Sequence, residues 1–526
     1  MPRKGKPVKR DELVLNSVGR PVPTALPQGR EVRPYSGLHT PPVKKEGIGR
    51  PLRFSIPREN KVVEGIEDAI KRVELSDGMT ISFHHHLRNG DLVVNTVVDA
   101  IHRMGIRDIK IFPSALFPVH EHLIPYIEDG TISWIEGSLN GPLGRFASEG
   151  GLLPHPVVLR THGGRTRAIE AGDVVIDVAF LAASAADPAG NMTGAVGPSA
   201  FGAAGFAFAD AWYARKVVVV TDNIVPYPCT PISIPSTCVD VVAKVDRIGD
   251  PEGIGWGTTQ ITRDPRMLMV ARRVIKVLEA AGYLKNGFSF QAGAGGTSLA
   301  VVKFLGDYFK ERGLVASFAM GGTTGYVVRM LDEGTLQAIL DAQAFDLKAI
   351  ESLTKNPNHM EVSHHHFGNP HTGGAITHQQ TACFLGATEI DVDFNVNVNT
   401  HSDGYLLHGT GGHTDAAVGS EVTIITAPLI RGRIPVIRER VTTITTPGEA
   451  VDVVVTDHGV AVNPRREDLL KSLKKTDLPV VDIEDLKRKA LSLVGKTIEP
   501  KLGDEVIAVV EYRTGEILDS VFRVLK

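Results

Sequence analysis

Side chains that could bind or activate an anion are densest between Glu389 and His413. Over Glu389–Asn399, acids and amides alternate with apolar residues, which is the period of a β-strand with one buried face. Asp and Asn are depleted in strands, so this polar face indicates a bound partner. The alternative is a solvated sheet face followed by a long loop. The residues expected to act here are three catalytic side chains and four binding residues: Glu389, Asp403, His413, Asn395, Asn397, Gly411 and Gly412.

Two glycine-rich turns in the C-terminal half follow predicted strands. The strand at Phe288–Gln291 leads into Ala292–Ser298 and then a helix, and the strand at Leu314–Phe318 leads into Met320–Thr324. Exposed N–H groups and a helix dipole together form an anion site. Neither turn has the Gly-Lys-Ser/Thr of a phosphate loop, and Ser298 stands where a dinucleotide fingerprint needs glycine. The pattern favours a carboxylate or a thioester carbonyl over a tight turn without a ligand, and the binding residues expected are Gly293, Gly295, Gly296, Thr297, Ser298, Gly321, Gly322 and Thr323.

A third polar loop, His84–Gly90, follows the predicted strand at Met79–Phe83. Three consecutive histidines point in alternating directions and have no further ligand at metal spacing, so we predict no metal site. We expect His84, Arg88 and Asn89 to contact an anion instead. Arg431 could likewise pair with a carboxylate, the alternative being a solvated charge on a sheet edge.

Composition narrows the class of protein. The chain has 526 residues, 42% of them hydrophobic, and a formal net charge of −3, which predicts at least two globular domains without bulk attraction to nucleic acid or membranes. Its three cysteines form neither a disulfide framework nor a zinc spacing, which indicates the reducing cytoplasm. No apolar run reaches the length that spans a membrane.

Strands alternate with helices along most of the chain, which predicts an α/β fold with mostly parallel sheets. Residues 1–58 are basic and rich in proline, so we expect an extended arm that a partner orders. The first α/β domain is predicted over 59–285 and the second over 286–526. At the C-terminus, Val506–Tyr512 and Ile517–Val524 alternate around Thr514-Gly515 as a hairpin.

Several long motifs closely resemble the family of citrate lyase alpha subunits. They include Asp77-Gly-Met-Thr-Ile-Ser-Phe-His-His, Gly293-Ala-Gly-Gly-Thr-Ser, Pro428-Leu-Ile-Arg-Gly-Arg-Ile-Pro435 and Thr456-Asp-His-Gly-Val-Ala-Val-Asn-Pro464, and the resemblance covers roughly residues 60–526. It implies two CoA-transferase-like α/β domains with the active site between them. It also implies that citrate replaces acetate on the thioester of an acyl-carrier (gamma) subunit, and that a beta subunit then cleaves the citryl thioester to oxaloacetate. The phosphoribosyl-dephospho-CoA group would belong to the carrier and not to this chain, which is expected to form a homo-oligomer.

Many CoA-transferases use a glutamate in the second glycine turn as nucleophile, but Met320–Thr324 contains no acid. The resemblance therefore implies direct formation of an acetyl-citrate anhydride. In this scheme His413 with His84, Arg88 or Arg431 receives the citrate carboxylates. Asp403 and Glu389 orient them, with Glu389 as nucleophile left as an alternative. The competing functions are another acyl-CoA transferase (citramalate included), an acyl-CoA hydrolase, or a non-catalytic scaffold for the carrier.

Overall fold

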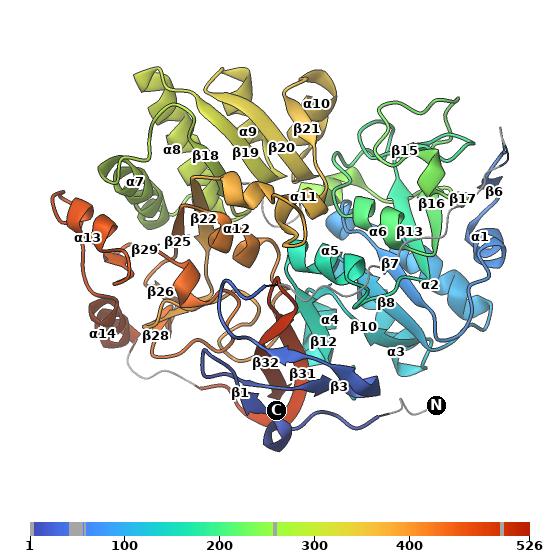
Figure 1. Ribbon diagram of the computed structural model, residues 1–526, viewed down its shortest axis with the longest axis horizontal. Helices are drawn as coiled ribbons and strands as arrows, with labels where there is room; N and C mark the ends of the chain where they lie inside the picture. Colours follow the sequence, from blue (N-terminus) through green and yellow to red (C-terminus); the bar gives the residue numbers. More distant parts are fainter. Residues whose placement is uncertain (1–4, 42–55, 57–58, 256–259, 495–498, 526) are drawn as a thin grey trace.

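Two large sheets, each built from one half of the chain, form the framework (Figure 1). The computed structural model describes residues 5–41, 56, 59–255, 260–494 and 499–525. In Figure 1 the helices α5 (His162–Glu170) and α11 (His364–Gly368) lie between the two sheets, and they pack against each other. The loops that leave the two sheets therefore meet near these helices.

The first sheet has seven parallel strands in the order β10-β8-β7-β13-β16-β17-β6. The central strands are nearly continuous runs of valine, alanine and isoleucine because helices cover both faces. The elements are β6 (Val62–Val63), α1 (Ile66–Arg72), β7 (Thr80–Phe83), α2 (Val93–Arg103), β8 (Ile109–Pro113), α3 (Ile124–Glu128), β10 (Ile132–Ile135), α4 (Pro142–Ser148), β13 (Val178–Ala183), α6 (Ala207–Tyr213), β16 (Lys216–Thr221) and β17 (Val241–Lys244).

The second sheet has eight strands in the order β21-β20-β19-β18-β22-β25-β29-β30, all parallel except the last pair. The predicted α/β class with mostly parallel sheets is confirmed. The elements are α7 (Pro265–Ala280), β18 (Ser289–Ala292), α8 (Gly296–Arg312), β19 (Ala316–Thr323), α9 (Gly325–Asp332), β20 (Leu336–Ala344), α10 (Leu347–Lys355), β21 (His359–Glu361), β22 (Ala382–Gly386), α12 (His413–Gly419), β25 (Val422–Thr426), β29 (Val453–Val455), β30 (Val460–Val462), α13 (Glu467–Leu473) and α14 (Ile483–Val494).

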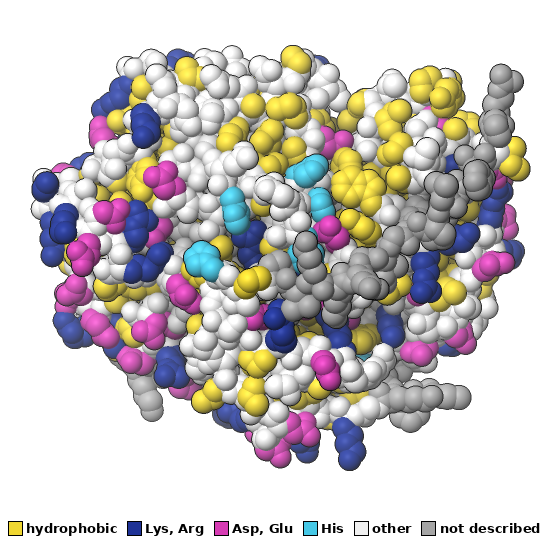
Figure 2. All heavy atoms as spheres, viewed as in Figure 1, with side chains coloured by type: hydrophobic (Ala, Val, Ile, Leu, Met, Phe, Trp, Pro, Cys, Tyr) yellow, Lys and Arg dark blue, Asp and Glu magenta, His cyan; other side chains and the backbone are white. Residues whose placement is uncertain are grey.

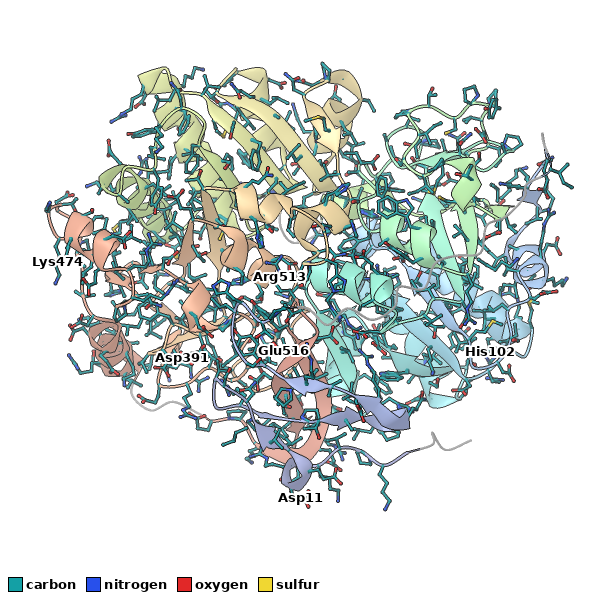
Figure 3. All side chains as sticks on the ribbon, viewed as in Figure 1. Asp11, His102, Asp391, Lys474, Arg513 and Glu516 are labelled. Atoms are coloured by element: carbon teal, nitrogen blue, oxygen red, sulfur yellow. The ribbon has the colours of Figure 1, made fainter. Side chains whose placement is uncertain are left out.

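The predicted C-terminal hairpin forms, and it joins the two halves of the chain. Its strands β31 (Leu502–Glu511) and β32 (Glu516–Val524) form a sheet in the order β12-β31-β32-β5, with β12 (Val157–Arg160) from the first half and β5 (Arg33–Pro34) from the arm. At the hairpin tip, Arg513 lies near the centre of the molecule (Figure 3) and donates to the carbonyl of Gly368 at 2.7 Å. The predicted boundary at 285/286 stays a prediction.

Residues 5–41 of the expected arm pack on the chain's own hairpin. The Tyr35 N–H donates to the carbonyl of Ile517 at 2.9 Å, and the Asn16 amide donates to that of Leu518 at 2.8 Å. Arg30 reaches the buried carboxylate of Glu511, which also pairs with Arg160. The described arm thus packs on its own chain, and the rest of residues 1–58, apart from residue 56, lies outside the described residues. No helix in the ranges given above is long and apolar enough to cross a membrane.

Candidate active site

The carboxyl ends of strands from both sheets meet at one interface. Gln343, near the end of β20, donates its side-chain amide to the carbonyl of His85 at 3.3 Å. The guanidinium carbon of Arg88 lies 4.9 Å from the centre of the Phe345 ring. We call the interface of residues 84–90 and 201–206 with residues 291–298, 320–324 and 343–345, together with the adjoining helices α5 and α11, the seam. Because ligands of open α/β sheets bind outside the carboxyl ends of the strands, the seam is the candidate active site.

Arg88 is held in an unusual backbone conformation at the seam. Its φ of 53° lies in the left-handed region, which non-glycine residues adopt where the surrounding structure constrains them, often at binding sites. The side chain is buried, and its guanidinium lies over Phe345 and Phe117. Burial lowers the pKa of Arg88 to about 10, so the group still carries its charge at neutral pH. A buried, oriented cation of this kind can bind a carboxylate.

The two glycine turns lie side by side and line one small cavity. Its walls include Gly293 and Ala294 after β18, and Gly322 and Thr323 at the end of β19. The cavity measures about 10 Å³, room for about one water molecule. Beside it, α8 begins at Gly296 after Gly295, which has no side chain to cap the helix. Within the described ranges the first amides of α8 therefore have no side-chain cap and can donate to a ligand, and the binding role of Gly295, Gly296, Thr297 and Ser298 stays a prediction.

Glycine is required in the second turn by its neighbours. A Cβ at Gly322 would lie 2.0 Å from the Phe345 ring, and a Cβ at Gly321 would lie 3.1 Å from the Gln291 amide nitrogen. Gly321 also has a φ of 94°, which disfavours any side chain. These two glycines let Phe345 pack on the turn and let Gln291 lie across the sheet.

Histidine and phenylalanine rings fill the seam between the first sheet and α11. The ring of His85 lies 4.9 Å from that of Phe206, which stacks on His364 at 3.5 Å and contacts His162 at 4.9 Å. His84 bonds to the carbonyl of Ala182 at 3.1 Å, and burial lowers the pKa of its ring to about 4. Figure 2 shows histidine side chains gathered near the middle of this face. Across the ranges that the structure describes, no three His, Cys, Asp or Glu side chains could hold a metal ion.

Several buried polar atoms at the seam lack a hydrogen-bond partner. Most buried polar atoms in proteins are bonded, so each exception calls for an explanation, such as a missing ligand. Within the described part of the chain, these atoms include Nε2 of His86, Oε1 of Gln291, Oγ1 of Thr324 and Nδ1 of His364. Oε1 of Gln291 and Oγ1 of Thr324 lie beside the glycine turns and support a ligand site there.

The predicted strand over Glu389–Asn399 is wrong, because the chain turns back within it. Strand β23 (Glu389–Asp391) pairs antiparallel with β24 (Val396–Asn397), and Phe394 in the turn has a φ of 65°. The alternating acids and amides face each other across this hairpin. Asn397 donates its amide to Glu389 at 2.9 Å, and Asn395 donates to Asp391 at 3.2 Å. The partner that this polar face indicated is therefore the protein itself.

Glu389 is fully occupied by the protein. Its carboxylate pairs with Arg438 and accepts the Thr442 N–H at 2.7 Å. Burial disfavours the charged form, but Arg438 and the hydrogen bonds outweigh it and lower the pKa of Glu389. A carboxylate held this way is a poor nucleophile and has no free oxygen for a substrate. In Figure 3 Arg513 lies near the centre of the molecule, and Asp391, close to Glu389 in the chain, lies away from it.

Two further predicted residues lie outside the seam. Asp403 is exposed, accepts the Tyr405 N–H at 3.2 Å, and lines a separate cavity of about 440 Å³ with Arg433 and Lys501. Arg431 is exposed and donates to the carbonyl of Ala387 at 3.1 Å. The structure thus does not bring Asp403 or Arg431 to the glycine turns.

His413 is the first residue of α12. Its Nε2 bonds to the carbonyl of Gly386 at 3.0 Å, so its Nδ1 accepts from the Thr446 hydroxyl at 2.7 Å. Burial lowers the pKa of His413 to about 4, so the ring is neutral and both nitrogens are in use. Gly411 and Gly412 instead reach the seam, because the Gly411 carbonyl accepts the His162 N–H at 2.9 Å. Asn89 lies beside Arg88 and accepts the Val119 N–H at 3.1 Å.

Comparison with known proteins decides the family. A model of the citrate lyase alpha subunit family matches residues 59–524. The chain belongs to the citrate lyase alpha subunit family. The citrate lyase alpha chain of Klebsiella pneumoniae is 46% identical over 468 residues, which cover 89% of this chain and 92% of that one. The alpha chain of Haemophilus influenzae is 45% identical over 482 residues, covering 91% and 95%.

Solved structures agree with this membership of the citrate lyase alpha subunit family. The alpha subunit of citrate lyase from Streptococcus mutans, in complex with citrate, has a TM-score of 0.93 at 43% identity and covers 97% of this chain and 100% of its own. A Pseudomonas malonate decarboxylase hetero-tetramer in complex with malonate has a TM-score of 0.63 at 16% identity, and each chain covers 84% of the other. That second likeness shows the fold alone.

For this member of the citrate lyase alpha subunit family, sequence reasoning missed the residues that only folding brings to the seam. Gln291 and Gln343 are polar residues within apolar strands close to their carboxyl ends, a signal that could have marked them. Phe206 and Phe345 carry no such signal, because phenylalanine is a common residue of hydrophobic cores. His364 belongs to a run of three histidines, a signal that could have marked it, and its ring stacks on Phe206.

Proposed function

We propose that the seam transfers an acyl-carrier thioester from acetate to citrate, producing citryl thioester and acetate. The observation that carries this proposal is that the seam combines free backbone amides and the cation Arg88 with a glycine turn, Met320–Thr324, that holds no acid. Family membership supports citrate as the acid. The engagement of Glu389 by Arg438 supports a route without an enzyme carboxylate.

The chemistry balances without any net proton transfer. A citrate carboxylate oxygen attacks the acetyl carbon, the C–S bond breaks, and the thiolate leaves with the electron pair. The thiolate then attacks the citryl carbonyl of the mixed anhydride, and the C–O bond breaks to release acetate. In both steps negative charge develops on a carbonyl oxygen, which oriented N–H groups stabilise.

The residues of the seam divide these tasks. The amides at Gly293–Ser298 and Gly321–Thr323 hold the oxyanion or the phosphates of the carrier arm. Arg88 holds a citrate carboxylate, and Phe345 with the surrounding rings excludes water, which would hydrolyse the anhydride.

The partners follow from the same proposal. The acetyl thioester would arrive on the phosphoribosyl-dephospho-CoA arm of the gamma (acyl-carrier) subunit, and the beta subunit (citryl-ACP lyase) would cleave the product. Family membership supports a multisubunit assembly, and a homo-oligomer and a cytoplasmic location remain part of this proposal.

A single-turnover experiment with labelled citrate tests both the function and the route. The chain is mixed with acetyl-carrier protein and citrate whose carboxyl groups carry ¹⁸O, and acetate is analysed by mass spectrometry. Direct attack leaves one citrate oxygen in the acetate of the first turnover. An enzyme carboxylate would put its own unlabelled oxygen there, so unlabelled first-turnover acetate would overturn the direct route. Absence of acetate would overturn the function itself.

A further inference from the structure

His85 lies at the seam with its ring bonded on one side only. Its Nδ1 lies 2.6 Å from the hydroxyl of Ser114, which follows β8, and the same hydroxyl accepts the His85 backbone N–H at 3.0 Å. The ring also packs on Phe206 and Phe117 at 4.9 and 5.7 Å between centres. These contacts hold the imidazole in one orientation.

The Ser114 hydroxyl determines which nitrogen of His85 carries the proton. Ser114 has a single hydroxyl proton. Among the described residues, the acceptor that this proton can reach is Nδ1 of His85. The hydroxyl therefore donates to Nδ1, which leaves the imidazole proton on Nε2. Nε2 has no acceptor in the described part of the chain, and it is not one of the buried atoms cut off from solvent. His85 thus presents an unused N–H.

The proposed acyl transfer needs a donor of this kind. No proton is gained or lost in the reaction, and the thiolate must attack again in the second step. A donor that released its proton to the thiolate would convert the thiolate to a thiol and stop that attack. A neutral imidazole keeps its proton, whereas an imidazolium gives it up readily. Burial, together with nearby His162 and Arg88, holds the pKa of His85 well below its usual range. The groups facing the ring from other elements, Arg165 on α5 and His364 on α11, add no negative charge.

We propose that the Nε2–H of His85 donates a hydrogen bond to the thioester carbonyl oxygen as negative charge develops there, with Ser114 as the positioning residue that keeps the proton on Nε2. This inference rests on the proposed function. It assigns separate tasks to two polar residues of the loop 84–90: Arg88 binds the citrate carboxylate in the ground state, and His85 acts in the transition state. The buried rings of His84 and His413 are less suited, because His84 bonds to Ala182 and both nitrogens of His413 are in use.

Ser114→Ala with Ser114→Thr as its matched control tests the positioning role. Losing the hydroxyl frees the proton to move to Nδ1, so Ser114→Ala is expected to lower kcat for acetate release ten- to hundredfold. Citrate affinity by calorimetry should stay within twofold, since His85 acts after citrate binds. Ser114→Thr keeps a hydroxyl and should recover most of the kcat. A kcat within twofold of the wild type in Ser114→Ala overturns the inference.

A second pair of variants tests the donor itself. Gln can place an amide N–H near the position of Nε2, so His85→Gln should keep more activity than His85→Leu. Citrate binding and the melting temperature show that each variant is folded. Loss of citrate affinity in parallel with kcat would mean that His85 binds a ground-state carboxylate, which overturns its assigned role. Absence of acetate release by the wild type would overturn the proposed function first, and is thereby distinguished from failure of this inference.

Discussion

Arg88 and Phe345 join the two halves of the chain at the candidate active site, with the guanidinium carbon 4.9 Å from the centre of the ring. The ring itself packs where a side chain at Gly322 would otherwise lie. The loop 84–90 of the first sheet and the glycine turn 320–324 of the second sheet therefore both contact the ring of Phe345. A cation placed on an aromatic face in a buried site is oriented without losing its charge. This arrangement leads to the first two predictions.

Replacing Arg88 by Met should weaken citrate binding. Without the guanidinium the citrate carboxylate loses a charge-assisted pair, and the KM for citrate should rise at least about tenfold, roughly 1.4 kcal/mol. The KM of Arg88→Lys should lie between those of the wild type and Arg88→Met, since an ammonium group cannot bind a carboxylate bidentately. Steady-state acetate release against citrate concentration measures this. Arg103→Met, which removes an exposed arginine paired with Glu67, is the control, and an unchanged KM in Arg88→Met would contradict the assignment.

Gly322→Ala should disturb the site through Phe345. The added Cβ would meet the ring at 2.0 Å, so the ring must move and take its contact with Arg88 along. We expect kcat/KM to fall at least about tenfold with a modest loss of stability. Gly386→Ala, at the end of β22 in the same sheet, adds a Cβ that meets nothing within 4 Å and should change kcat/KM less than twofold. Equal effects of the two variants would show that Phe345 does not transmit the change.

Glu389→Gln should destabilise the protein rather than stop the chemistry. The amide cannot neutralise buried Arg438, which would keep only its pair with the exposed Glu499, and breaking a buried ion pair costs about 3 kcal/mol. Urea unfolding measures the free energy of unfolding, and kcat per folded molecule should stay near the wild-type value. A stable, correctly folded Glu389→Gln protein without activity would restore Glu389 as a catalytic residue.

The buried histidines predict a loss of stability in mild acid. His413 has a pKa of about 4 in the folded protein against 6.5 when unfolded, because burial disfavours the charged ring. The unfolded chain therefore binds the proton first, and stability is lost as pH falls from about 6.5 towards 4. In His413→Gln this contribution is absent, so lowering the pH from about 7 to 5 should cost that variant about 2 kcal/mol less than the wild type. Urea unfolding at both pH values checks it; equal losses would show that His413 is not held neutral.

Sequence patterns determined the large-scale fold because they act locally. Valine-rich runs such as Val217–Val220 are apolar on both faces, so both faces must be buried. They form the parallel strands expected. The glycine turns after β18 and β19 depend on neighbours within a few residues. Long motifs were enough to predict the family. Arg88 and the glycines of the turns were also predicted to bind an anion, because cations and strand-end glycines indicate anion binding without knowledge of the partner segment; their binding role stays a prediction.

Only the tertiary structure decided which polar residues are free to bind a ligand. Glu389, Asn395 and Asn397 have the composition of a site, but a hairpin turn pairs Asn397 with Glu389 and Asn395 with Asp391, and Glu389 also pairs with Arg438. Period-two alternation is the same for one long strand and for two short strands folded together, so the sequence could not distinguish them. Conversely, Gln291, Gln343 and Phe345 lie far from His85 and Arg88 along the chain. They reach the seam because the neighbouring strands of both sheets run parallel and direct their carboxyl ends to the same interface.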